Sequence, residues 1–177
     1  LNWVRELNAN FVRLAHYPHN EHMPRLADEM GILLWEEIPV YWTIDWENPE
    51  TLANAKNQLA ELISQDRNHA SVIIWSMANE TPVSDQRNEF LSELVKTARS
   101  LDDTRLISAA MEVHYEGSTR VLDDPFGAHT DIISFNQYHG WYGGDRDEFS
   151  QLEWEIQYDK PVIVSEWGGG ALYGFRA

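Results

Sequence analysis

The fold of this 177-residue chain is decided by the stretch Ser71–Glu80, which reads Ser-Val-Ile-Ile-Trp-Ser-Met-Ala-Asn-Glu. The run Val72–Trp75 is apolar without alternation and rich in β-branched residues, a pattern typical of a strand buried on both faces of a parallel sheet. Polar Asn79 and Glu80 follow, and Thr81-Pro82 then stops regular structure. Most glutamates are solvated surface residues, but α/β barrels place their reactive groups at this end of a strand. Glu80 is therefore a candidate for chemistry.

A second stretch has the same form. It is Pro161–Gly169, Pro-Val-Ile-Val-Ser-Glu-Trp-Gly-Gly, again an apolar run that ends in a glutamate, Glu166. Two carboxylates at strand ends indicate cleavage of a glycosidic bond, because one carboxylic acid must protonate the leaving oxygen while the other attacks the sugar or activates water. Asn79 supports this interpretation, since its amide can bind a sugar 2-hydroxyl. Simple solvation of the two strand ends is the alternative to catalysis.

Outward from these two stretches, predicted strands and helices alternate along the chain. Six apolar runs predict strands at residues 11–15, 32–35, 71–80, 106–110, 132–135 and 161–164. Helices are expected at residues 20–30, 49–66 and about 84–101, with a further helix that contains Phe149, Leu152 and Ile156, and a polar loop at residues 112–130. Such alternation implies βαβ units and a parallel sheet. Polar residues follow nearly every strand, which favours a TIM-type barrel over an open sheet with its site at one switch point.

The chain is short for a complete barrel, which typically needs about 250 residues. We expect a single domain, residues 1–177, that forms a partial α/β barrel of about six strands without the first and eighth strands. The sequence does not begin with Met and has no signal peptide, so we expect a segment of a longer chain or a processed product. Open sheet edges favour pairing with another chain, and we therefore expect self-association.

Composition excludes several classes of partner. Thirteen basic and twenty-nine acidic residues give a formal charge of −16, which disfavours nucleic acids and anionic membranes because both are bound through Lys and Arg. No apolar stretch approaches the roughly 18 residues of a membrane span. The chain has no Cys, so disulfides and thiolate chemistry are excluded and the compartment stays open between cytoplasm, periplasm and secretion.

Four stretches together resemble glycoside hydrolase family 2, and within it the β-glucuronidases most closely. Val12–Pro18, Val-Arg-Leu-Ala-His-Tyr-Pro, looks like the family's second barrel strand, and Ile73–Glu80 looks like its fourth. Asn136–Tyr142, Asn-Gln-Tyr-His-Gly-Trp-Tyr, is similar to the sixth strand of glucuronidases, from which β-galactosidases differ more. Val164–Gly168 looks like the seventh strand. The resemblance extends over nearly the whole chain.

The resemblance implies a retaining exo-β-glycosidase that needs no cofactor and acts on carbohydrate. Glu80 would be the general acid/base and Glu166 the nucleophile, and retention predicts that their carboxyl groups lie roughly 5–5.5 Å apart. Tyr138 is expected to donate a hydrogen bond to Glu166 and orient it. The substrate-binding residues implied by the resemblance are His16, Asn79, Asn136, Tyr138, Tyr142 and Trp167.

Two further groups of residues carry expectations. Glu36 or Glu37 is expected to bind substrate or to pair with Arg13, and Trp75 is expected in the core because it lies inside an apolar run. Aromatic faces suit the apolar C–H surface of a sugar, and we expect a wall of stacking rings made by Trp35, Trp141, Tyr142 and Trp167.

The sequence also departs from the family pattern. Trp167 stands where glucuronidases often have Tyr or Phe, and no Asn-x-Lys motif, which reads the sugar carboxylate in glucuronidases, follows Glu166. The expected substrate is therefore a β-glucuronide first and a β-galactoside second. A non-catalytic fragment with residual sugar binding is the alternative of another class. A metal-dependent hydrolase built on His16, His19 and His22 is a distant third, because their spacing matches no established zinc pattern.

Overall fold

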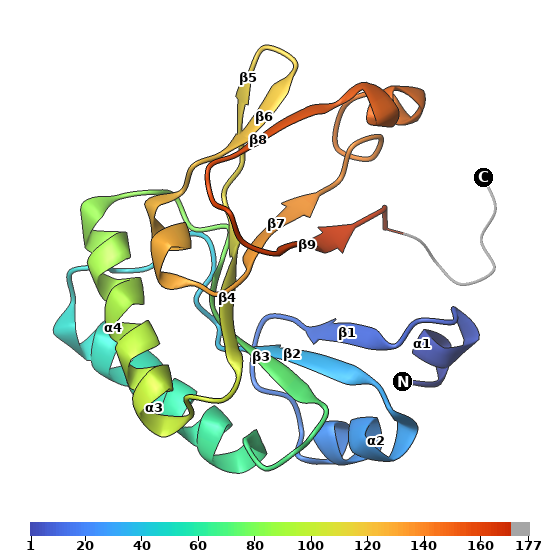
Figure 1. Ribbon diagram of the computed structural model, residues 1–177. Coiled ribbons are helices and arrows are strands. Elements are labelled where there is room, and N and C mark those ends of the chain that lie inside the picture. The colour runs from blue at the N-terminus through green and yellow to red at the C-terminus, as the bar shows by residue number, and fades with distance from the viewer. Residues whose placement is uncertain (171–177) are drawn as a thin grey trace.

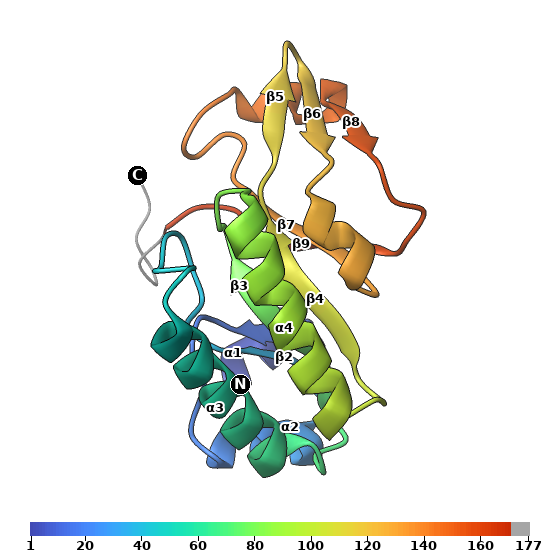
Figure 2. The same cartoon turned by 90° about the vertical axis from the view of Figure 1, so that its left-hand side faces the viewer.

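The computed structural model describes residues 1–170, apart from the side chain of Arg146. Within this part of the chain, six strands form one sheet and three form a second, smaller sheet (Figure 1). Helices pack on the outer face of the larger sheet (Figures 1 and 2). The smaller sheet lies at the opposite end of the molecule from the helix His22–Met30 (Figures 1 and 2). No helix of the described residues is long and apolar enough to span a bilayer.

The larger sheet confirms the prediction of a partial TIM-type barrel. Its strands pair in the order in which they follow one another along the chain, and every pair is parallel. The sheet curls so that the two edge strands face each other (Figure 1), and Arg13 on the first donates to Glu166 on the last at 2.7 Å. The strands are β1 (Phe11–Leu14), β2 (Leu33–Glu37), β3 (Val72–Asn79), β4 (Leu106–Met111), β7 (Ile133–Gln137) and β9 (Val162–Trp167).

The helices begin and end where local chemistry favours it. Asn48 accepts a hydrogen bond from the backbone N–H of Glu50, and Ser84 accepts one from Arg87, so each caps the helix that follows. Gly31, with φ of 68°, ends the second helix in the left-handed conformation. The helices are α1 (Asn2–Glu6), α2 (His22–Met30), α3 (Pro49–Asp66) and α4 (Asp85–Leu101).

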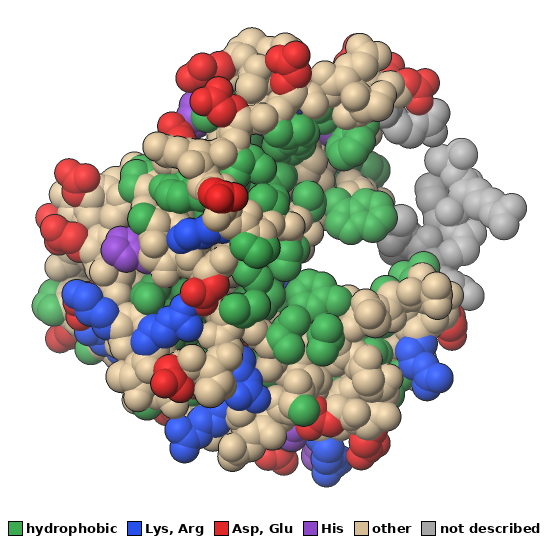
Figure 3. Space-filling model, viewed as in Figure 1, with side chains coloured by type: hydrophobic (Ala, Val, Ile, Leu, Met, Phe, Trp, Pro, Cys, Tyr) green, Lys and Arg blue, Asp and Glu red, His purple; other side chains and the backbone are tan. Residues whose placement is uncertain are grey.

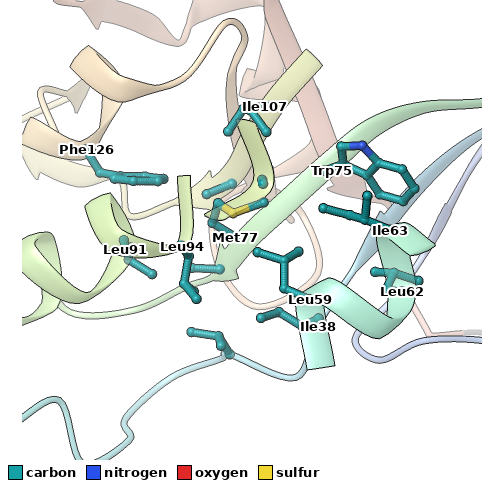
Figure 4. Close-up of a cluster of buried hydrophobic side chains, with 14 of the residues drawn as sticks. Ile38, Leu59, Leu62, Ile63, Trp75, Met77, Leu91, Leu94, Ile107 and Phe126 are labelled. Atoms are coloured by element: carbon teal, nitrogen blue, oxygen red, sulfur yellow. The ribbon is translucent and has the colours of Figure 1, made fainter. Parts of the chain in front are cut away.

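The main core lies between α3, α4 and the outer face of the sheet (Figure 4). Leu59 and Leu91 from the two helices and Met77 from β3 are fully buried there. Trp75 is also fully buried and donates its Nε1–H to Asp102 at 3.0 Å, which confirms its predicted place in the core. Burial of such side chains contributes roughly 1.5–3 kcal/mol each, so this layer stabilises the barrel strands and fixes where their ends lie.

The second sheet was not predicted. Residues 112–130, expected to form a polar loop, contain the hairpin β5 (His114–Glu116) and β6 (Thr119–Leu122), followed by the 3-10 helix η1 (Pro125–His129). The hairpin turns at Gly117, whose φ of 62° belongs to the region that glycine adopts readily. The prediction was wrong because the strands are short and their outer residues are polar.

The helix expected around Phe149, Leu152 and Ile156 is also wrong. A 3-10 helix, η2 (Arg146–Gln151), is followed by strand β8 (Glu153–Ile156), which pairs parallel with β6. The spacing fits a helix, but Trp154 and Ile156 also alternate with glutamates, which is the period of a strand. Trp154 packs against Phe135 of β7 with ring centroids 4.8 Å apart, so the second sheet is anchored on the barrel.

Candidate active site

Polar side chains from five strands gather inside the barrel at the carboxyl ends of its strands. This is where parallel strands present their functional groups in an α/β barrel. The space-filling view shows the molecule hollowed on this side, with hydrophobic side chains around the hollow (Figure 3). The hydrogen-bonded cluster consists of Arg13, His16, Glu37, Asn79, Glu80, Asn136, Tyr138 and Glu166.

Arg13 lies at the centre of this cluster. Its Nε and Nη2 donate to the two oxygens of Glu37 at 2.8 and 2.9 Å, and its Nη1 donates to Glu166 at 2.7 Å. Nη2 also donates to Asn79 Oδ1 at 2.8 Å. Planar guanidinium groups bind carboxylates in this forked geometry, so Arg13 fixes side chains of β2, β3 and β9 relative to one another.

Glu37 is the internal counter-charge of Arg13. It is 2% exposed and also accepts hydrogen bonds from Trp35 Nε1 at 2.7 Å and from His16 Nδ1 at 2.7 Å. Burial alone would raise its pKa, but the hydrogen bonds and the charge of Arg13 outweigh burial and lower it. Glu37 is thus the carboxylate that pairs with Arg13, as predicted, whereas Glu36 points to the other face of β2.

Glu166 combines firm contacts with access to solvent. Besides Arg13, it accepts the predicted hydrogen bond from the hydroxyl of Tyr138. Burial, this bond and nearby negative charges raise the pKa of Tyr138, so its hydroxyl stays protonated and remains a donor. The Glu166 side chain is 24% exposed, so it is held in place and can still be reached by a ligand.

Glu80 follows β3 in an unusual backbone conformation, with φ of 48°. A non-glycine residue in this region is uncommon and costs energy, which the surrounding contacts must offset. Asn136 Nδ2 donates to one oxygen of Glu80 at 3.0 Å, and Trp42 Nε1 approaches the other at 3.3 Å. Asn136 Oδ1 in turn accepts from Arg13 at 3.3 Å, so one amide links the surroundings of both candidate carboxylates.

Two of the histidines singled out in the sequence lie in different surroundings. His16 lies in the cluster, with its Nε2 3.8 Å from Glu166. His19 lies outside the cluster, where its Nε2 donates to the backbone oxygen of Ala15 at 3.2 Å and its ring stacks on Tyr17. Within residues 1–170, no group of three or more acidic or histidine side chains is arranged to hold a metal ion.

The predicted wall of stacking rings needs a correction. Trp35 is fully buried and donates its indole N–H to Glu37, so the prediction that it belongs to the stacking wall is wrong. Trp141, Tyr142 and Trp167 are 53%, 81% and 80% exposed. Of these, Tyr142 contacts Tyr138 with ring centroids 5.2 Å apart and lines the cavity beside Glu80, whereas Trp167 does not line it.

A cavity of about 500 Å³ adjoins Glu80. Glu112, Tyr115 and Arg120 line it from the β4–β6 segment, and residues 136–139 and 142–144 line it from the end of β7 and the loop that follows. The walls of this cavity therefore come partly from the second sheet, which sequence patterns did not predict, and partly from the predicted strand β7 and the loop that follows it.

Sequence reasoning missed the central role of Arg13 and the contact of Trp42 with Glu80. Arg13 is the one charged residue of the short strand β1, and its acceptors lie up to 153 positions away in the sequence. No local sequence pattern shows which distant residues will surround it. Trp42 lay in a stretch without period, residues 40–48. Its position depends on backbone bonds with Asn79, which donates to Val40 at 2.9 Å and accepts from Trp42 at 3.0 Å.

An α/β barrel with carboxylates, amides and a tyrosine at its strand ends belongs to a large class of barrel enzymes and their relatives. Comparison with known families narrows this class. Residues 1–175 match the description "Glycosyl hydrolases family 2, TIM barrel domain", and the chain belongs to that family.

Several known proteins are similar to the chain. A beta-glucuronidase of Paenibacillus borealis is 34% identical over 99% of the chain, and one of Streptococcus agalactiae is 30% identical over 100% of it. The crystal structure of a beta-galacturonidase from Eisenbergiella tayi bound to galacturonate superimposes with a TM-score of 0.80, at 31% identity over 98% of the chain. The chain spans 32%, 33% and 32% of the length of these three proteins, about a third in each case.

Proposed function

We propose that this chain is the catalytic barrel segment of a retaining exo-β-glycosidase that removes terminal β-linked sugars. The observation that carries the proposal is the linked pair Glu80 and Glu166. Glu80 follows β3 and Glu166 lies near the end of β9, and both contact the Asn136–Arg13 bridge. Two carboxylates facing one sugar are what double displacement requires.

In this mechanism Glu166 attacks the anomeric carbon and Glu80 protonates the leaving oxygen. Arg13 and Tyr138 hold Glu166 through hydrogen bonds to different oxygens, so the carboxylate is oriented before substrate arrives. Glu80 then accepts a proton from the water that hydrolyses the covalent glycosyl intermediate. The expected separation of roughly 5–5.5 Å between the two carboxyl groups remains a prediction.

Asn79 and His16 are proposed to bind the sugar. The Asn79 amide lies next to Glu80, with Nδ2 3.4 Å from its carboxylate, where it can reach a 2-hydroxyl. His16 lies near Glu166, with its Nε2 3.8 Å from that carboxylate. Tyr142 is proposed as an aromatic contact because its exposed ring lines the cavity, and Trp167 remains a proposal on the resemblance alone. The chemistry needs no cofactor.

The proposed substrate is a β-linked uronide, a glucuronide first. The relatives named above are called beta-glucuronidases and a beta-galacturonidase, which supports an acidic terminal sugar. A β-galactoside is the second candidate, because the resemblance to glycoside hydrolase family 2 also includes β-galactosidases. A folded segment that binds sugar without turning it over is the non-catalytic alternative, since errors of about 1 Å in positioning can reduce a rate about 100-fold.

The test is release of 4-nitrophenol from β-glucuronide, β-galacturonide, β-galactoside and β-glucoside substrates. We expect turnover of a uronide, and loss of at least about 1,000-fold in kcat for Glu166→Gln and Glu80→Gln, because each removes one of two essential groups. Glu89→Gln, on the exposed side of α4, is the matched control. Wild-type rates in both site variants would contradict the proposed roles, and sugar binding without turnover would favour the non-catalytic alternative.

A further inference from the structure

Three arginine side chains in the described part of the chain are less than a tenth exposed, and one of them has no counter-charge. Arg13 is paired with Glu37, and Arg87 is paired with Asp124 through two bonds of 2.7 and 2.8 Å. Arg120 on β6 is 7% exposed, and no carboxylate of the described residues lies within 4 Å of its nitrogens. A buried charge without a partner is costly, so Arg120 is the exception that needs an explanation.

The groups that do contact Arg120 are uncharged. Its Nη2 donates to His139 Nδ1 at 2.9 Å, and the other ring nitrogen, Nε2, lies 2.6 Å from the backbone oxygen of Asp145. Nε2 must carry the proton to bond a carbonyl, and Nδ1 must accept, so this histidine is neutral. The guanidinium also lies over the rings of Tyr115 and Trp154, at 5.3 and 5.7 Å. Ring faces attract a cation but do not neutralise it.

Arg120 retains unused hydrogen-bonding capacity. Its Nε is buried and has no hydrogen-bond partner in the described structure, although buried polar groups are normally satisfied. The side chain nevertheless lines the 500 Å³ cavity together with Tyr115, His139 and Glu80. A rigid, desolvated guanidinium at the wall of an open cavity is suited to binding a carboxylate or a similar anion.

The place of the cavity indicates which part of a substrate it would receive. Glu80 lines the cavity, whereas Glu166 and His16 do not. In the proposed mechanism the acid/base carboxyl protonates the leaving oxygen, so a space that adjoins Glu80 but not Glu166 lies on the leaving-group side. The second sheet, through Tyr115 and Arg120, forms the wall of this space.

We propose that this cavity is a leaving-group subsite for an aglycone that carries an anionic group, which pairs with Arg120. The assignment to the leaving group rests on the proposed function, whereas the anion site itself rests on Arg120 and the cavity. Tyr115, which is 64% exposed and lines the cavity, offers a ring face to an aryl or sugar aglycone. Glu112 is the other acidic group of the cavity. Burial and the charge of Glu80 raise its pKa, which reduces its repulsion of an anion.

The experiment measures binding of 4-hydroxybenzoate and of its uncharged analogue 4-hydroxybenzamide to the whole chain by titration calorimetry. The wild-type protein is expected to bind the benzoate about 10- to 100-fold more tightly, since hydrogen bonds to charged groups are the strong ones. The preference should weaken as salt is added. Equal affinity of the wild-type protein for the two compounds would overturn the proposal without any variant.

Two variants locate the effect. Arg120→Met should abolish the preference for the benzoate, and Arg120→Lys should keep part of it because the charge is retained. Circular dichroism confirms that each variant is folded before titration. A preference that survives in folded Arg120→Met would overturn the role of this residue.

A third ligand distinguishes an acidic aglycone from an acidic terminal sugar. Arg120→Met could weaken binding of free D-glucuronate and leave binding of 4-hydroxybenzoate unchanged. In that case the cavity binds the terminal sugar, and the leaving-group assignment is overturned. None of these titrations requires turnover. An Arg120-dependent preference in a chain that hydrolyses no glycoside would therefore support the anion site and count against the proposed function alone.

Discussion

Glu36 and Glu37 are neighbours on β2 and are buried to the same extent, 3% and 2% exposed, yet they lie in opposite electrostatic surroundings. Glu37 faces the barrel interior, where Arg13 and its hydrogen bonds lower its pKa. Glu36 faces the helix layer, where burial, together with the charge of Asp66, raises its pKa to about 8. The Oε2 atom of Glu36 has no hydrogen-bond partner.

The comparison teaches that partners, rather than burial, decide the charge of an interior carboxylate. A strand that sends alternate side chains to opposite faces places one carboxylate in a preorganised polar site and the next in the helix layer beside another buried carboxylate, Asp66. The first supports the candidate active site, and the second lowers stability as pH rises from 4.5 to about 8. Four predictions test this contrast.

The largest effect is expected when the partner of Arg13 is removed. Glu37→Met keeps the volume of the side chain but leaves Arg13, His16 and the indole N–H of Trp35 without their shared acceptor. Removing one member of a buried ion pair typically costs about 3–5 kcal/mol, and we expect a loss of that size in urea unfolding. The exposed control Glu89→Gln should stay within about 0.5 kcal/mol of wild type. A similarly small change in Glu37→Met would show that the pair is not structural.

A smaller effect is expected from Trp35→Phe. This change keeps an aromatic ring in the core and removes only the hydrogen bond of 2.7 Å to Glu37. Because hydrogen bonds to charged groups are worth about 1.5–3 kcal/mol, we expect a loss in this range by the same measurement. If Trp35→Phe weakened sugar binding while stability stayed unchanged, Trp35 would act on the ligand rather than on Glu37.

The pH dependence of stability should reveal Glu36. Its folded pKa of about 8 lies above the ordinary value of 4.5, so its favourable contribution is complete below pH 4.5 and is lost as pH rises toward and through 8. The slope from this group is at most about 1.4 kcal/mol per pH unit. Glu36→Gln removes the ionisable group, and we expect the variant to gain stability relative to wild type as pH rises. Parallel stability curves for the two proteins between pH 5 and 8 would contradict this account.

The smallest effect is expected for Trp42. Its indole N–H contacts Glu80 in the way that the indole N–H of Trp35 contacts Glu37, but Trp42 is exposed. Its side chain is 63% exposed and its indole N–H lies 3.3 Å from Glu80. Trp42→Phe removes a bond worth about 0.5–1.5 kcal/mol, so we expect kcat/KM to fall about 3- to 10-fold with stability unchanged. The pH dependence of kcat/KM distinguishes loss of the contact with Glu80 from a general loosening of side-chain packing, because only the lost contact would shift the profile.

Much of the barrel could be predicted because its strands are continuous apolar runs bounded by polar residues and helix caps. Asn79, Glu80 and Glu166 were predicted from the same pattern, since a strand end fixes where the next side chains lie. Glu36 and Glu37 could not be told apart, because the sequence does not show which face of β2 carries a countercharge. That depends on Arg13, 24 positions away from Glu37.

The second sheet could not be predicted from local sequence patterns. β5 and β8 are three and four residues long, and β8 gains its strand conformation by pairing with β6, more than 30 positions earlier. The uncompensated charge of Arg120 is likewise visible only once its neighbours in space are known. Short elements that depend on distant partners carry the weakest sequence signal.

The central claim is that Glu166 attacks the sugar, and covalent trapping tests it most directly. A 2-deoxy-2-fluoro-β-glucuronosyl fluoride slows hydrolysis of the glycosyl intermediate, so the intermediate should accumulate on the nucleophile. Mass spectrometry of the whole chain, followed by peptide mapping, is expected to show one added sugar on Glu166 and none on the Glu166→Gln variant. An adduct on another residue, or no adduct under conditions where the β-glucuronide is hydrolysed, would contradict the account.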